Sequence, residues 1–277
     1  MFKIDYTFLI TISGFILLAI ASGLLSSLLV IKKETLINDV VSHSTLPGII
    51  ICFIFLKNNS YFILSLGAFI SGVLALILIK KIKKNVNLDL NSLLVIILSI
   101  FMGFGFVLLS VIRRNPSTQQ AGIESYLLGQ AVSINIYDVF FLFVIDLILI
   151  LIIILFFKEL KMFIFDSLYM QSTNYDINII NNLFVLMIIL AIISQIQMIG
   201  IIFTASMLTI PGLFAIQWAK SFTQTIVYAI LISIISVLIS AFLSASFEKV
   251  SMGASCVFIL SLITLISLVI KNKKGAK

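Results

Sequence analysis

Long apolar runs separated by short polar segments take up most of this chain. A membrane-spanning helix needs about 20 mainly apolar residues, and backbone inside hydrocarbon must satisfy its own hydrogen bonds, which favours helices. We therefore predict an all-α polytopic membrane protein in which a single transmembrane domain covers residues 1–277. About nine transmembrane helices are expected, at about residues 7–31, 46–56, 61–79, 92–112, 139–157, 179–199, 200–219, 223–246 and 253–270.

Two regions of this pattern are weaker than the rest, so eight helices stay open as an alternative. The run at 46–56 is apolar for only eleven residues and spans the membrane only if its helix begins near Asp39 and carries polar residues inward. The stretch over 179–219 is continuously apolar, and it accommodates two spans if the chain turns tightly near Met198 to Gly200. An outer-membrane barrel is excluded, because its strands would alternate apolar and polar residues with a period of two.

The composition agrees with a membrane location and excludes several other classes of protein. Hydrophobic residues make up 61% of the chain and charged residues 10%, so a soluble fold could not bury the apolar part. Disordered proteins, disulfide scaffolds and nucleic-acid-binding modules need polar or cysteine-rich compositions, whereas this chain has 2 Cys. We therefore expect the chain to be surrounded by a lipid bilayer and to bind no nucleic acid.

The distribution of basic residues predicts the orientation in the membrane. If the N-terminus lies outside, thirteen of the 18 Lys and Arg residues fall on the inner side and five on the outer side. Short cytoplasmic loops carry an excess of Lys and Arg. We therefore predict the N-terminus outside and the C-terminus in the cytoplasm, and this segregation also favours nine helices, because merging two of them would destroy it.

Two predicted loops are long enough to have a function of their own. The loop over residues 113–138 lies outside and contains an apolar patch at Glu124 to Ser133 that is typical of a short re-entrant or interfacial helix. The loop over residues 158–178 lies inside and contains Phe163 to Met170, an apolar segment with the spacing of a short amphipathic helix. A soluble partner could bind such a helix from the cytoplasm.

Acidic residues and histidine are scarce, so polar chemistry has few candidates. His43 is the single histidine of the chain and follows Asp39 by four residues, which places both side chains on one helix face. Ionisable residues inside a span mark a substrate path by default, and His and Asp are ligands of zinc, manganese or iron. Because one His and one Asp make an incomplete metal site, a cap at Asp39 and a carbonyl partner for His43 form the alternative.

Two of the 3 prolines lie in apolar stretches, and each is followed by glycine, at Pro47-Gly48 and at Pro211-Gly212. Proline removes a helical hydrogen bond and kinks or breaks a helix. Broken helices in transporters place backbone groups beside the substrate, whereas kinked helices also serve ordinary packing. Both interpretations of these two dipeptides, helix break and packing kink, stay open at this point.

The segment Asp39 to Gly48, DVVSHSTLPG, resembles the D-x-x-[SA]-H-[SA]-x-L-P-G signature of the zinc, manganese and iron permeases of ATP-binding-cassette importers. Further similarities follow in the same order at Asn91 to Ser110, Leu127 to Asp138, Phe165-Asp166 and Gln197 to Ala215; the last is specific like the first, and the middle ones are weaker. The chain departs from the pattern at several positions, and Asn38 stands where the family usually has glycine. None of the departures falls on the Asp and His of the signature.

The resemblance implies a fold similar to that of type II importer permeases and a location in the bacterial cytoplasmic (inner) membrane. It also implies that the chain imports a divalent transition metal, zinc first and manganese or iron next, with no stably bound cofactor. Expected partners are a second copy of the chain, a cytoplasmic ATPase dimer and an extracytoplasmic metal-binding protein. The chain has no G-x-x-x-x-G-K-[ST] loop, so ATP must bind to a separate polypeptide, and the chain itself is not expected to be an enzyme.

The resemblance also implies roles for particular residues. The metal path is assigned to Asp39 and His43, the ATPase contact to Phe165, Asp166, Leu168 and Tyr169, and the external gate to Gly129 and Gln130. An ion-gradient-driven carrier is the competing hypothesis, but it should show more intramembrane acids and, often, inverted repeats. A membrane-embedded enzyme would need more His, Asp or Glu residues near one face.

Overall fold

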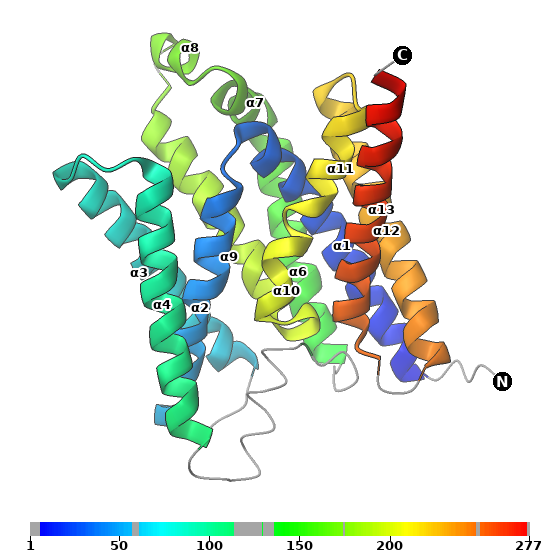
Figure 1. Cartoon of the computed structure of the whole chain (residues 1–277). Coiled ribbons are helices and arrows are strands. Elements are labelled where there is room, and N and C mark those ends of the chain that lie inside the picture. Colours follow the sequence, from blue (N-terminus) through cyan, green and yellow to red (C-terminus); the bar gives the residue numbers. More distant parts are fainter. Residues whose placement is uncertain are drawn as a thin grey trace.

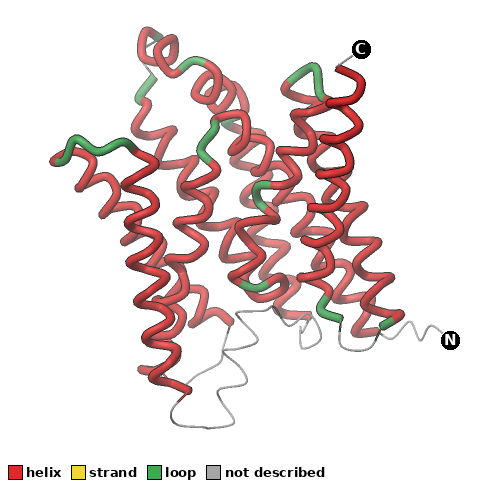
Figure 2. Tube along the Cα trace, in the orientation of Figure 1, coloured by secondary structure: helices red, strands yellow, loops and turns green. Residues whose placement is uncertain are grey.

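The computed structural model describes residues 6–56, 61–113, 129, 136–173, 175–247 and 250–275, and within these ranges every regular element is a helix (Figures 1 and 2). The helices are α1 (Tyr6–Lys32), α2 (Thr35–Leu56), α3 (Tyr61–Asn85), α4 (Leu90–Arg113), α6 (Ile136–Leu155), α7 (Phe157–Phe165), α8 (Ser167–Ser172), α9 (Ile177–Ile199), α10 (Ile201–Met207), α11 (Ile210–Trp218), α12 (Phe222–Ser246) and α13 (Met252–Gly275).

The predicted number of spans is confirmed over the described part of the chain. Nine segments there are long and apolar enough to cross a membrane, with α10 and α11 together making the seventh. The weak second run is part of α2, which begins at Thr35, so this span carries the polar residues of its first turns inward. The start of α1 and the end of α13 lie at opposite ends of the bundle (Figure 1).

One end of the bundle, which we call the lysine-rich end, carries Lys32 at the end of α1, Lys80 to Lys84 on α3, Lys158 and Lys161 on α7, and Lys271 on α13. This end lies toward the top of Figure 1, together with α7 and α8. By the positive-inside rule it is the predicted cytoplasmic end.

The predicted tight turn between the sixth and seventh spans is confirmed at Gly200. This residue ends α9 and precedes α10, with φ 91° and ψ 153°. Only glycine adopts such a conformation without strain, because any Cβ would clash with the neighbouring backbone. One glycine therefore divides a continuous apolar stretch into two spans.

Close helix packing holds the bundle together. α2 packs along α3 and α4, and α1 packs along α11 and α12. A Cβ on Gly67 of α3 would lie 2.5 Å from the carbonyl oxygen of Gly48 on α2, and one on Gly23 of α1 would lie 2.6 Å from the Cα of Ile230 on α12. Small residues that let helix backbones approach are typical of membrane bundles, where apolar burial does not drive association.

The seventh span is interrupted in its middle, where α10 ends at Met207 and α11 begins at Ile210. Side chains from the first two helices satisfy the backbone groups around this gap. Asn38 Nδ2 donates to the carbonyl of Ala205 at 2.9 Å, and Ser26 Oγ donates to the carbonyl of Thr209 at 3.2 Å and accepts from the amide of Gly212 at 2.6 Å. The interruption is therefore tolerated because it is enclosed in protein.

Candidate functional site

Asp39 and His43 lie one helical turn apart on α2, and both side chains are half-buried. Among the residues that the structure describes, neither side chain has a hydrogen-bonding or ionic partner. A single copy also does not complete a metal site, since no group of three His, Cys, Asp or Glu side chains is found in the described part of the chain. The pair therefore presents one imidazole and one carboxylate that are both partly exposed and could be reached by ligands from outside this chain.

The adjacent face of α2 carries a second polar pair with the same spacing, Asn38 and Ser42. Both are 0% exposed. The side-chain amide of Asn38 also donates to Thr209 Oγ1 at 3.2 Å, while Asn38 Oδ1 and Ser42 Oγ have no hydrogen-bond partner among the described residues. Asn38 therefore contacts both sides of the interruption between α10 and α11, and Ser42 follows it one turn later on the same buried face of α2.

Asn38 and Ser42 were not singled out as site residues from the sequence. The signal that could have found them is their i, i+4 spacing among polar positions inside a span, because polar side chains in a membrane face the protein interior. Asn38 also stood out as a departure from the resembling family's glycine. In this protein the side-chain amide of Asn38 donates a hydrogen bond to the carbonyl of Ala205, near the end of α10.

The two Pro-Gly dipeptides have different structural effects. A helix break at Pro47-Gly48, one of the two interpretations of that dipeptide, is not what the structure shows, because α2 continues through both residues. Proline has no N–H, so the carbonyl four residues earlier, that of His43, receives no helical hydrogen bond from it. The next carbonyl, that of Ser44, accepts a hydrogen bond from Ser71 Oγ at 2.5 Å, and this contact with α3 supports the turn.

At the second dipeptide the helix is interrupted, two residues before Pro211. This proline lies in the first turn of α11, a position where its missing N–H costs nothing. Gly212 follows and lies directly against α1, where a Cβ would overlap the carbonyl of Ser26. Pro211 and Gly212 therefore start the second half of a broken span beside α1.

The four residues assigned to the ATPase contact lie at the lysine-rich end, at the junction of α7 and α8. Asp166 caps α8, and its side chain accepts a hydrogen bond from the amide of Tyr169 at 2.9 Å. Phe165, Leu168 and Tyr169 are 59%, 75% and 56% exposed. Three large side chains thus stand in the open at the predicted cytoplasmic end.

Of the two residues assigned to the external gate, the structure describes Gly129, while Gln130 and most of the expected loop at 113–138 lie outside the described residues. Gly129 has φ 78°, and a Cβ there would lie 2.5 Å from the backbone carbon of Ile199. The positive φ and the close approach both require glycine, and Gly129 lies against Ile199 at the end of α9. The turn from α9 to α10 lies at the end of the bundle opposite to the lysine-rich end (Figure 1).

The fold is that of a polytopic membrane protein, and comparison with known proteins places the chain in a family. The model of the family described as "ABC 3 transport family" matches residues 5–271. The chain belongs to this family and is a transport subunit.

Relatives with related names cover nearly all of the chain. The zinc transport system membrane protein TroC of Treponema pallidum is 31% identical over 98% of this chain and 91% of its own length. The manganese transport system membrane protein MntC of Bacillus subtilis is also 31% identical, over 95% of this chain and 61% of its own length. The percentage identity to this chain is thus the same for two relatives that are named for different metals.

A solved structure supports the fold. PsaBC from Streptococcus pneumoniae, in complex with a Fab, superposes with a TM-score of 0.84, at 24% identity over 95% of this chain and 91% of that chain. This similarity confirms the predicted permease architecture.

Proposed function

We propose that this chain is the membrane-spanning permease subunit of an ATP-driven importer of a divalent transition metal, with zinc as the substrate, in a bacterial cytoplasmic membrane. The observation that carries the proposal is the pair Asp39 and His43, one turn apart on one half-buried face of α2. Imidazole nitrogen and carboxylate oxygen are zinc ligands, and a zinc site in proteins usually has four of them. Membership of the ABC 3 transport family and the name of the TroC relative agree with this assignment.

A second copy of the chain would supply the missing ligands. If the two Asp39-His43 pairs face each other across a twofold axis, they form a four-ligand site from two incomplete halves. Such a site holds the metal briefly, since conduction requires binding that is weak enough for release. The metal would be received from an extracytoplasmic binding protein near Gly129 and Gln130, and released after ATP hydrolysis on a separate cytoplasmic ATPase dimer.

Manganese is the second candidate substrate. The MntC relative has the same identity to this chain as TroC, and carboxylate ligands suit manganese as well as zinc. Iron is the third, because the same ligand types also bind ferrous iron.

The experiment that tests the proposal measures zinc, manganese and iron in metal-limited cells that lack this protein, by mass spectrometry. Wild type is expected to restore one metal, and His43→Ala is expected to fail although it inserts normally. Cys52→Ala is the matched control, a half-buried α2 position nine residues on and therefore on the opposite face. If no metal changes in the deletion, or if His43→Ala restores it fully, the proposal is wrong.

Pairing of two copies is tested separately by crosslinking. A His43→Cys variant should crosslink to a second copy through a short bis-thiol reagent, because the two residues 43 would lie near the axis. Wild type, with its own Cys52 and Cys256, sets the background. Crosslinking at the background level would place residue 43 away from its symmetry mate.

The junction of α7 and α8 is proposed to transmit ATP hydrolysis to the bundle. Its exposed Phe165, Leu168 and Tyr169 provide an apolar surface, and Asp166 fixes the first turn of α8. Tyr169→Ala should uncouple ATP hydrolysis from metal uptake while membrane insertion is unchanged, because Tyr169 is 56% exposed and contributes little to the core. Tyr175→Ala, at a residue that is 40% exposed outside α8, is the control. Normal coupling in Tyr169→Ala would remove the assignment.

A further inference from the structure

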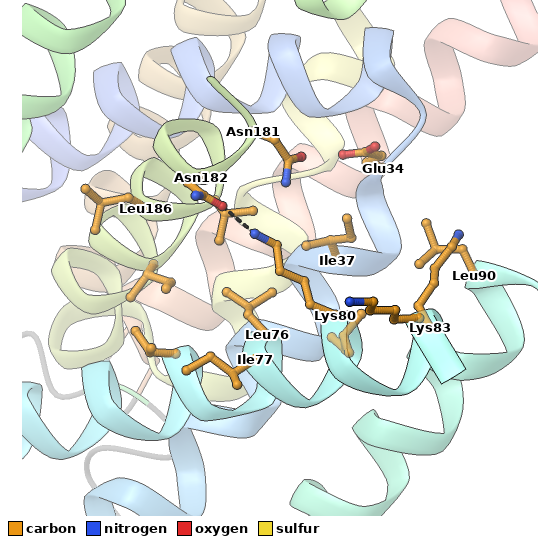
Figure 3. A pocket seen from close by; sticks show the side chains of 15 residues that line it. Glu34, Ile37, Leu76, Ile77, Lys80, Lys83, Leu90, Asn181, Asn182 and Leu186 are labelled. Carbon is orange, nitrogen blue, oxygen red and sulfur yellow. Dashed lines mark hydrogen bonds between the residues drawn. The ribbon is translucent and has the colours of Figure 1, made fainter. Parts of the chain in front are cut away.

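A groove of about 650 Å³ opens at the lysine-rich end between α3 and α9, and Ile37 from the first turns of α2 contributes to it (Figure 3). Its volume lies within the range typical of small-molecule sites, enough to hold a headgroup and part of an acyl chain. The metal path and the ATPase contact described above share no residue with its lining. The groove therefore has no role in the mechanism proposed so far.

The groove has an apolar part and a polar part, which follow each other along the helix axes. Toward the membrane interior its walls are apolar and consist of Val73, Leu76 and Ile77 from α3 with Val185, Leu186 and Ile189 from α9. Toward the lysine-rich end it is polar, with Lys80, Lys83 and Lys84 on α3 opposite Asn181 and Asn182 on α9. Lys80 reaches across this end, and its Nζ donates to Asn182 Oδ1 at 2.5 Å (Figure 3).

The charge at the polar end is positive. Glu34 is the acidic residue of the lining, and it forms an ion pair with Lys32 at 2.9 Å. Because Glu34 is paired with Lys32, no acidic residue among the described lining residues neutralises the charges of Lys80, Lys83 and Lys84. A negatively charged group at this end would therefore meet three ammonium groups and two amides.

The apolar walls indicate what carries that negative charge. Ile77 is 54% exposed and Leu186 is 38% exposed, so the apolar part is open at the surface of the bundle. Both residues lie inside segments that are long and apolar enough to cross a membrane, so hydrocarbon chains are the expected neighbours of this part of the groove. A hydrocarbon chain fits the apolar walls and a phosphate fits the lysines, and basic pockets between transmembrane helices on the cytoplasmic side bind anionic lipid headgroups.

We propose that this groove binds an anionic phospholipid of the inner leaflet, with its phosphate at Lys80, Lys83 and Lys84 and its acyl chains between α3 and α9. The lipid bridges α3 and α9 at the place where α3 diverges from the bundle (Figure 1). The proposal rests on the membrane architecture and does not depend on which metal is transported.

Native mass spectrometry of the purified wild-type chain in mild detergent tests the proposal. Dioleoyl phosphatidylglycerol and dioleoyl phosphatidylcholine, which share their acyl chains, are added at equal concentrations. Phosphatidylglycerol should bind more tightly by at least about tenfold, because each lysine near the surface strengthens binding to an anionic lipid. Equal binding of the two lipids would overturn the proposal.

Two variants and one control separate the parts of the groove. The triple variant Lys80→Gln/Lys83→Gln/Lys84→Gln should bind phosphatidylglycerol no better than phosphatidylcholine. The control Lys81→Gln/Lys158→Gln/Lys161→Gln removes the same charge from outside the groove and should bind like wild type. Val185→Trp keeps every lysine but fills the apolar part, and it should also lose the preference.

Other outcomes identify a different ligand and overturn the proposal. Displacement of the lipid by an excess of glycerol phosphate would show a phosphate site that does not use the acyl chains. A triple variant that keeps its lipid but no longer co-purifies with the ATPase would show that the lysines bind that protein instead. Equal loss of lipid in the triple variant and its control would show attraction by overall charge alone.

Discussion

Two faces of α2 carry polar pairs with the same spacing but have opposite surroundings. Asn38 and Ser42 are 0% exposed, and Asn38 contacts the interruption of the seventh span, where its side-chain amide bonds to backbone and side chain. Asp39 and His43, one position further along, are half-buried and have no partner in the described part of the chain. A rotation of about 100° around one helix thus separates a structural contact from a pair that stays available for a ligand.

The two faces of α2 show how a membrane permease can keep polar and ionisable groups inside a span. Polar groups in hydrocarbon are costly unless they are paired. The Asn38 amide is paired within this chain, and we expect Asp39 and His43 to be paired by cargo and a second copy. Substitutions on the inward face should therefore change stability, whereas those on the outward face should change transport.

The largest effect is expected at Asp39. Asp39→Asn keeps the size of the side chain but removes its charge, and metal uptake should fall by more than about tenfold, because weakening even an indirect contact to a metal costs that much. Thermal stability in detergent should not decrease, since the carboxylate has no partner to lose. Uptake of radioactive zinc or manganese and a thermal unfolding curve measure both effects.

Asp89→Asn is the matched control for this prediction. Asp89 precedes α4 outside the spans, where hydrogen bonds from Ser92 hold the pKa of its carboxyl below the ordinary value. Its charge therefore stabilises the fold at neutral pH, and this contribution disappears as the pH falls through the lowered pKa. Uptake should be normal in Asp89→Asn, and a loss of uptake there would show that the assay responds to any lost carboxylate.

An intermediate effect is expected at Asn38. Asn38→Ala removes the donor to the buried Ala205 carbonyl and should destabilise the protein by about 1–2 kcal/mol. Uptake per molecule of folded protein should stay near that of wild type. Thermal unfolding in detergent, with the exposed Asn91→Ala as the control, measures the loss. An unchanged melting temperature would mean that this bond does not stabilise the interruption.

The smallest effect is expected at Ser42. Its buried hydroxyl has no hydrogen-bond partner in the part of the chain that the structure describes, so Ser42→Ala removes an unsatisfied group and should be neutral or stabilise the protein by up to about 1 kcal/mol. Uptake should be unchanged. If uptake is lost at normal protein levels, Ser42 belongs to the substrate path, and the division between the two faces of α2 is wrong.

The number and placement of the spans were predictable from the sequence, because burial in hydrocarbon demands long apolar runs. The turn at Gly200 was predictable as well, since a glycine stood where two spans had to be divided. The start of α2 at Thr35 could be predicted only as one of two possibilities, because its first turns are polar. Polar residues are accepted inside a span only when contacts with other helices satisfy them. Local composition does not contain those contacts.

The two Pro-Gly dipeptides show where prediction from sequence ends. They look alike, but α2 continues through Pro47, whereas the seventh span is interrupted just before Pro211. The difference comes from partners that are distant in sequence. Gly48 of α2 packs closely against Gly67 of α3, whereas Ser26 of α1 donates a hydrogen bond to the carbonyl of Thr209. The i, i+4 spacing and the family resemblance predicted Asp39 and His43 as candidate ligands, whereas the contacts of Asn38 could be read only from the structure.

The interruption of the seventh span constrains the order in which the protein can be assembled during synthesis. Ser26 of α1 and Asn38 of α2 hydrogen-bond to backbone groups beside it, and both residues are made long before α10 and α11. Lipid offers no substitute for these contacts. We therefore expect the first two spans to lie next to the seventh span when it leaves the insertion machinery. The helices α1 and α2 would then supply the hydrogen bonds that α10 and α11 need in order to pack.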